Sequence, residues 1–236
     1  MTIWNIGLAL LLAYLAGAIP FGWVVVKIAS GKDIRTVESG RTGGTNAMRA
    51  AGFLAGLFTA GLDVLKGFST YWIVSWLTPG NEWIKVAAAL MAILGHNYSV
   101  FLIERGSHGK LQLRGGAGGA PCLGGAIAVG GPLMFFILPM AALVYVFVGY
   151  ASITTISIAG AAMIIAAFMT LFHGAPWVHI LYGAISIGVV MWALRPNLKR
   201  LREGNERAVG LRVLLRKRAA EKHPTPTRGS RGGQTL

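Results

Sequence analysis

Acidic residues are scarce in this chain, and charge of either sign is sparse. Eight of the 236 residues are Asp or Glu against 22 Lys or Arg, and charged residues make up 13%, where water-soluble domains carry roughly 25%. The single cysteine, Cys122, excludes an internal disulfide. No basic soluble domain is present, so we expect no nucleic-acid partner. We also expect no cleavable signal peptide, because the first apolar run is too long and lacks a basic leader.

Long apolar runs stand where charge is missing. The chain is 54% hydrophobic with a mean hydropathy of +0.60, which is typical of integral membrane proteins. Apolar runs cover residues 3–28, 50–77 and 83–103, and residues 120–194 are nearly continuous apart from proline and glycine breaks. If that last stretch holds four short spans, the sequence predicts an all-α integral membrane protein with about seven transmembrane helices, some short or broken.

Positive charge gathers in three segments of the chain. Residues 195–236, 29–50 and 104–119 carry +9, +2 and +2 of the net charge of +14. Basic loops mark the cytoplasmic side, so we predict an N-terminus outside and a C-terminus in the cytoplasm. Residues 1–210 would form the membrane domain. Residues 211–236 would form a basic, disordered cytoplasmic tail beside anionic membrane lipids.

One polar stretch, residues 31–49, interrupts the apolar runs. It holds four glycines and four Lys or Arg residues. Glycine lets backbone N–H groups approach an anion, and arginine supplies forked donors that match phosphate oxygens. The stretch therefore predicts a phosphate cradle at the membrane surface. An ordinary basic cytoplasmic loop is the plainer alternative.

Three further features carry potential chemistry. Asp63 and Lys66 share one helix face within an apolar run, where ionisable residues are either functional or paired to fix helix packing. His96 lies near the inner end of the third run, as a candidate base or a structural residue. Residues 114–119 then form a second glycine-rich loop, which is either an anion site or a flexible connection. It is not a Walker A loop, since no Gly-Lys-Ser/Thr follows at the required spacing.

Together these motifs resemble one family, the bacterial glycerol-3-phosphate acyltransferases of the PlsY type. The resemblance extends from about residue 17 to residue 210. It rests on Ser39-Gly40-Arg41-Thr42-Gly43-Gly44-Thr45-Asn46 with Arg49, on Gly95-His96-Asn97 followed by Arg114-Gly115-Gly116-Ala117-Gly118, and on Asn197-Leu198-Lys199-Arg200-Leu201 with Glu206.

The resemblance implies a multi-pass enzyme of the bacterial plasma membrane with its active site on the cytoplasmic face. It would transfer an acyl chain from acyl phosphate to the 1-hydroxyl of sn-glycerol 3-phosphate, giving lysophosphatidic acid and phosphate in phospholipid synthesis. No cofactor or metal is implied, and a monomer is the expected state. No Ser-His-Asp arrangement is evident, so the leaving phosphate itself is one candidate to take the hydroxyl proton, beside His96.

The resemblance and the two basic loops together give the candidate site residues. The catalytic group would be Ser39, Asn46, Arg49, His96 and Glu206. Substrate and phosphate binding would involve Gly40, Arg41, Gly43, Gly44, Thr45, Lys66, Lys110, Arg114, Gly115, Gly116, Gly118, Ser152 and Asn197.

Several positions depart from the family pattern. Gly44, Pro121 and Leu194 stand where the family commonly has Ala, Thr and His, and two further departures change a charge. Arg41 stands where the family usually has Asn, and Ala117 stands where its second loop usually has Lys. Loss of a phosphate-facing Lys costs about 1.5–3 kcal/mol, unless Arg41, Lys110 or Arg114 restores the charge. A divergent member of the family with altered or lost activity is therefore an alternative.

Two non-enzymatic functions also remain open at this stage. A membrane transporter of a phosphorylated solute would use the intramembrane Asp63 and Lys66 and the broken helices. It predicts inverted repeats, and none is evident. A membrane scaffold with a basic lipid-binding tail would not need the glycine-rich loops.

Overall fold

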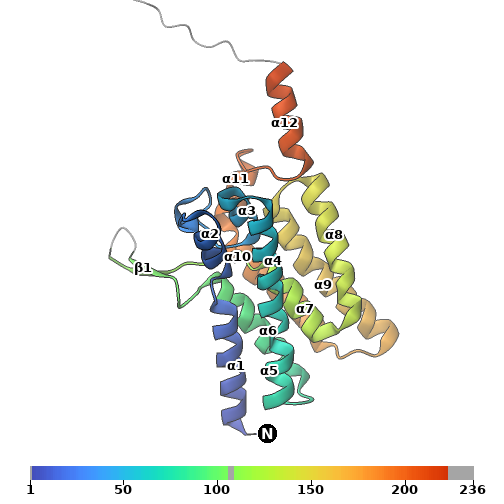
Figure 1. The fold of residues 1–236 in the computed structure, drawn as a ribbon. Helices are drawn as coiled ribbons and strands as arrows, with labels where there is room; N and C mark the ends of the chain where they lie inside the picture. Colours follow the sequence, from blue (N-terminus) through green and yellow to red (C-terminus); the bar gives the residue numbers. More distant parts are fainter. Residues whose placement is uncertain (1, 106–108, 223–236) are drawn as a thin grey trace, which may run out of the picture.

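The protein is built almost wholly of helices (Figure 1). The computed structural model describes residues 2–105 and 109–222. The helices before the second loop are α1 (Ile3–Ala18), α2 (Phe21–Ser30), the short η1 (Ile34–Thr36), α3 (Gly44–Ala51), α4 (Phe53–Phe68), α5 (Thr70–Leu77) and α6 (Glu82–Asn97). Those after it are α7 (Gly119–Gly130), η2 (Pro132–Phe136), α8 (Ile137–Leu143), η3 (Val144–Val148), α9 (Ala151–His173), α10 (Val178–Ala193), α11 (Arg195–Arg202) and α12 (Leu211–Lys222).

One small hairpin supplies the two strands found among the described residues. Strands β1 (Ile103–Arg105) and β2 (Leu111–Leu113) pair antiparallel, with Glu104 opposite Gln112. The hairpin projects from the side of the helical bundle (Figure 1). Most of it lies within the basic segment 104–119 and precedes the second glycine-rich loop, residues 114–119.

Helix α7 forms the centre of the bundle, because its small residues let other helices approach closely. Nearly every residue of α7 is buried. A Cβ at Gly124 would overlap the backbone of Val64 in α4, and a Cβ at Gly67 in α4 would overlap the backbone of Pro121 in α7. The main hydrophobic core then extends from α7 into α6, α9 and α10.

Large apolar side chains cover the outside of the bundle, as a protein surrounded by lipid requires. Trp4, Phe58, Trp76, Phe147 and Leu171 are all strongly exposed. By length and composition, two stretches of the described chain can cross a membrane, Ile3–Ser30 and Ala151–His173, and the bent pair Val178–Ala193 and Arg195–Arg202 would add a third. The other apolar helices are shorter, so about seven spans remains a prediction.

The two ends of the described chain lie at opposite ends of the bundle. The N-terminus lies at one end, and α2, α3, α11 and α12 lie toward the other (Figure 1). The basic segments at residues 29–50 and 195–222 therefore gather toward one end, as the charge pattern predicts.

The start of the predicted disordered tail, residues 211–222, is the helix α12. It differs from the expectation because the segment is rich in Leu, Arg, Lys and Ala, which favour helix. The rest of the predicted tail, residues 223–236, lies outside the described residues.

Candidate active site

The first polar stretch, residues 31–49, forms a loop that the side chain of Asn46 anchors. The side-chain amide of Asn46 donates to the carbonyl oxygens of Ile34, Val37 and Arg41, at 3.1, 3.0 and 2.8 Å. Helix α3, which carries Asn46, lies tightly on α4, where a Cβ at Gly44 would come within 2.8 Å of the Gly56 carbonyl oxygen. The glycines of this motif thus bring the loop onto the membrane helices.

Replacement of Asn46 by alanine is expected to lower the free energy of unfolding by about 1–3 kcal/mol, since it strips buried carbonyl oxygens of their donor. Turnover should fall with it, because the loop loses its anchor. Thermal unfolding in detergent micelles measures the first effect. Thr36→Ala is the matched control, since the Thr36 hydroxyl makes a single exposed bond to the Asp33 carbonyl oxygen. Equal unfolding temperatures for both variants would contradict the anchoring role.

A cavity of about 500 Å³ opens beside this loop. Its walls combine two kinds of surface. Polar side chains come from the loop, α3, α6, α9 and the segment after α10, while Phe53, Leu57, Leu138 and Ile158 give it an apolar side. Such a cavity suits a molecule with one anionic end and one hydrocarbon end.

Twelve of the predicted site residues line this cavity. They are Ser39, Arg41, Gly43, Gly44, Thr45, Asn46, Arg49, His96, Gly118, Ser152, Asn197 and Glu206. The remaining six do not line it: Gly40, Lys66, Lys110, Arg114, Gly115 and Gly116. Ala117, which stands where the family resemblance implies a lysine, lines it as well.

His96 is held at the cavity wall by the second loop. The Gly116 amide donates to the His96 carbonyl oxygen at 2.9 Å, and a Cβ at Gly116 would overlap the His96 ring. The ring Nδ1 lies 3.6 Å from the Asp63 carboxylate, which itself pairs with Lys66 Nζ at 2.9 Å. Gly115 and Gly116 therefore position His96 rather than forming the wall themselves.

Lys66 faces the protein interior. Besides Asp63, its Nζ donates to the Ile19 carbonyl oxygen at 2.9 Å, at the junction between α1 and α2. The pair thus joins α4 to that junction. Of the two interpretations left open by the sequence, this geometry favours the ion pair that fixes helix packing.

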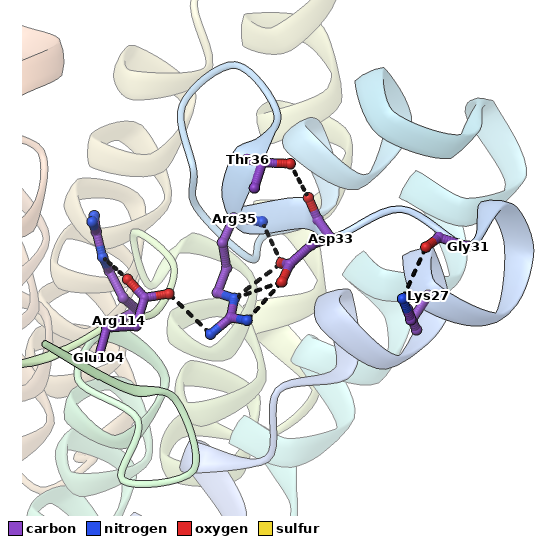
Figure 2. A network of polar contacts seen from close by, with 7 residues as sticks. All are labelled: Lys27, Gly31, Asp33, Arg35, Thr36, Glu104 and Arg114. Atoms are coloured by element: carbon purple, nitrogen blue, oxygen red, sulfur yellow. Dashed lines mark hydrogen bonds and ion pairs between the residues drawn. The ribbon is translucent and has the colours of Figure 1, made fainter.

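Arg114 is engaged in a chain of ion pairs outside the cavity. Figure 2 shows Arg35 between Asp33 and Glu104, with Arg114 on the other side of Glu104. The Arg35 guanidinium lowers the pKa of Asp33 to about 2. This chain of charges ties β1 to the first loop. Arg114 is consequently unavailable to replace a lysine at position 117, and Lys110 is exposed on the hairpin side.

The segment after α10 also contributes residues to the cavity wall. Glu206 is buried and accepts hydrogen bonds from Asn197 Nδ2 at 2.8 Å and Arg200 Nε at 3.2 Å. Arg207 pairs with Glu38 of the first loop at 2.7 Å. Residues about 170 positions apart in the sequence therefore meet at one site.

Arg41 and Arg49 are the two arginines on the wall with no carboxylate within 4.0 Å among the described residues; the third, Arg207, is paired. Burial lowers the pKa of Arg41 from its ordinary value, yet arginine stays protonated in proteins. Buried cations need an anion, so an anionic ligand in the cavity would stabilise these two side chains.

Sequence reasoning missed several cavity residues, chiefly Tyr145, Thr154, Thr155 and Arg207. Only Arg207 had a signal, since it follows Glu206 within a motif of the family resemblance. The hydroxyl residues lie in apolar helices, where Ser and Thr usually bond their own backbone. Within the residues that the structure describes, no group of three or more His, Cys, Asp or Glu side chains is placed to hold a metal ion.

Comparison with known proteins identifies the family. The family model described as glycerol-3-phosphate acyltransferase matches residues 7–204. This chain belongs to the glycerol-3-phosphate acyltransferase family. A relative from Moorella thermoacetica named glycerol-3-phosphate acyltransferase 2 is 35% identical over 205 residues, which cover 87% of this chain and 98% of the relative. A glycerol-3-phosphate acyltransferase from Thermus thermophilus is 37% identical over 207 residues, covering 88% and 96%.

Two solved structures of PlsY also resemble this chain. The crystal structure of PlsY, an integral membrane glycerol 3-phosphate acyltransferase, in its glycerol 3-phosphate form aligns with a TM-score of 0.74 at 28% identity, covering 89% of this chain and 98% of that one. Its lysophosphatidic acid form aligns with a TM-score of 0.71. The chain is therefore an all-α integral membrane protein of this acyltransferase family.

Proposed function

We propose that this family member transfers an acyl chain from acyl phosphate to the 1-hydroxyl of sn-glycerol 3-phosphate, giving lysophosphatidic acid and inorganic phosphate for phospholipid synthesis. The observation that carries the proposal is a single cavity with two unpaired arginines at one side and apolar side chains at the other. Both substrates bring phosphate, and the donor also brings a hydrocarbon chain.

For this reaction the protein needs mainly to orient the two substrates and to stabilise the charge that develops. The glycerol hydroxyl oxygen attacks the acyl carbonyl carbon, the bond from that carbon to the phosphate oxygen breaks, and the hydroxyl proton passes to the leaving phosphate or to His96. Arginine and backbone N–H donors stabilise the charge that develops on the carbonyl and phosphate oxygens. Holding both substrates in attack geometry supplies much of the remaining rate.

The location of the site follows from the charge pattern. The basic segments gather toward the end of the bundle that carries α11 and α12 (Figure 1). Basic segments mark the cytoplasmic side of a membrane protein. We therefore assign the site to the cytoplasmic face of the bacterial plasma membrane, with the N-terminus outside. We also propose that the monomer is the active unit.

The direct test mixes the purified protein, in detergent or lipid, with acyl phosphate and glycerol 3-phosphate. Phosphate release and lysophosphatidic acid formation should rise together, while acyl-CoA and acyl carrier protein donors serve as comparisons. Arg49→Ala should slow turnover by about 10- to 100-fold through loss of a charged phosphate contact. Lys110→Ala should match the unaltered protein, because Lys110 lies outside the cavity.

Two outcomes would contradict the proposal. Folded protein that is silent with acyl phosphate but active with another donor would assign a different acyl donor. Silence with every donor would favour the divergent member with altered or lost activity, for which Ala117 is the specific reason.

A further inference from the structure

Arg41 makes an unusual set of contacts for a residue of the first loop. Its guanidinium donates to the Gly116 carbonyl oxygen of the second loop at 3.0 Å and to the carbonyl oxygen of Ala193 at the end of α10. Both partners are neutral. A side chain from one glycine-rich loop thus reaches across to the other and is held there with its charge uncompensated.

Apart from Arg49, the other cations near the cavity are already neutralised by nearby carboxylates. Arg200 pairs with Glu206, Arg207 with Glu38, and Lys66 with Asp63. These pairs occupy both carboxylates of the cavity wall, Glu206 and Asp63. Neither one is within 4.0 Å of Arg41 in the described chain. Since a half-buried cation with only neutral partners retains most of its desolvation cost, an outside anion would stabilise it.

The surroundings of Arg41 match a phosphate group. Gly118, Gly119 and Ala120, at the start of α7, line the same cavity as Arg41, and amides at the start of a helix favour anions. Gly118 takes a positive φ of 90°, which turns the chain into the helix. The Ser152 hydroxyl of the cavity wall is buried, has no hydrogen-bond partner in the described structure, and can donate to a phosphate oxygen.

We propose that Arg41 holds the phosphate of one substrate against the second loop, taking the place that a lysine at position 117 would fill. This inference rests on the proposed acyl transfer and refines it. Arg49, whose guanidinium donates to the Ala208 carbonyl oxygen at 3.5 Å, then serves the other phosphate. The first loop then supplies the cation that the second loop lacks at position 117, within the same cavity.

A purely structural role is the competing explanation, because the same two bonds could simply clamp the loop to α10. Four variants separate the roles: Arg41→Gln, Ala117→Lys, the two combined, and Lys27→Ala as the control, because Lys27 is exposed and lies outside the cavity. Glutamine keeps amide donors for the two carbonyl oxygens but removes the charge. A lysine at 117 restores charge to the cavity without restoring the clamp.

We expect Arg41→Gln to raise the KM of one phosphate substrate by about 10- to 100-fold, with a smaller change in kcat. Adding Ala117→Lys should recover most of that loss. Inorganic phosphate should raise the unfolding temperature of the unaltered protein and of the double variant, and should do so much less for Arg41→Gln. Lys27→Ala should behave as the unaltered protein in every measurement.

Three results overturn the inference, and they differ from failure of the proposed reaction. Unchanged KM in Arg41→Gln overturns it, as does equal stabilisation of that variant and the unaltered protein by phosphate. A loss that Ala117→Lys does not repair, with a lowered unfolding temperature, assigns Arg41 the clamp. If the unaltered protein is inactive with every donor yet phosphate stabilises it through Arg41, the reaction fails and the anion site stands.

Discussion

Replacement of Lys66 by methionine is expected to lower the free energy of unfolding by about 3–5 kcal/mol, the usual cost of breaking a buried ion pair from one side. The Lys66 and Asp63 side chains are only 3% and 1% exposed. Methionine fills similar space but leaves the Asp63 carboxylate without its cation. It also leaves the Ile19 carbonyl oxygen without its donor. Denaturant unfolding in detergent micelles measures the loss.

The double variant Asp63→Asn with Lys66→Met should be more stable than Lys66→Met alone, because no unpaired charge remains inside. Lys85→Met is the matched control, since its pair with Glu82 at 2.7 Å is partly exposed and should be worth about 1 kcal/mol or less. A Lys66→Met protein as stable as the Lys85→Met protein would show that the buried pair does not hold the helices together.

Much of the site could be predicted from sequence because its polar parts are local. The first loop, His96, Asn197 and Glu206 each lie in a short motif, and glycines among apolar runs mark them clearly. Their meeting at one cavity follows from the fold of the family. The structure adds the contacts of individual residues, such as the three hydrogen bonds by which Asn46 anchors the loop.

The remaining features depend on contacts between distant segments. The sequence suggested that Lys110 and Arg114 could each bind phosphate. In the structure Arg114 instead forms an ion pair with Glu104 of β1. The apolar side of the cavity was invisible for another reason. Leu138 and Ile158 have the same hydrophobic pattern as neighbours that face lipid, so periodicity cannot tell them apart.

The helix count shows the same limit. Hydropathy distinguishes a membrane protein from a soluble one, yet short segments such as η2, α8 and η3 follow each other with little change in composition. Proline and glycine mark where such segments break, without fixing their direction. The predicted division of residues 120–194 into four spans therefore rested on charge balance.

Replacement of Gly116 by alanine is expected to reduce turnover by about 100-fold, the scale of loss that follows from displacing a reacting group by ~1 Å. A Cβ there would lie 2.6 Å from His96 Cε1 and 2.9 Å from Cδ2, and closer still to Nε2. The ring is buried and cannot give way without leaving its position near Asp63. The Gly116 carbonyl oxygen that receives Arg41 would move with it.

Gly61→Ala is the matched control, because a Cβ at Gly61 in α4 meets nothing within 4 Å. It should keep full turnover and gain slightly in stability, since alanine favours helix. The acyl-phosphate assay compares the two proteins at a temperature that lies equally far below the unfolding temperature of each. Full turnover in Gly116→Ala would mean that neither the His96 ring nor the contact between the loops needs its present position. The leaving phosphate alone would then have to accept the proton, which makes this variant the sharper probe of where the proton goes.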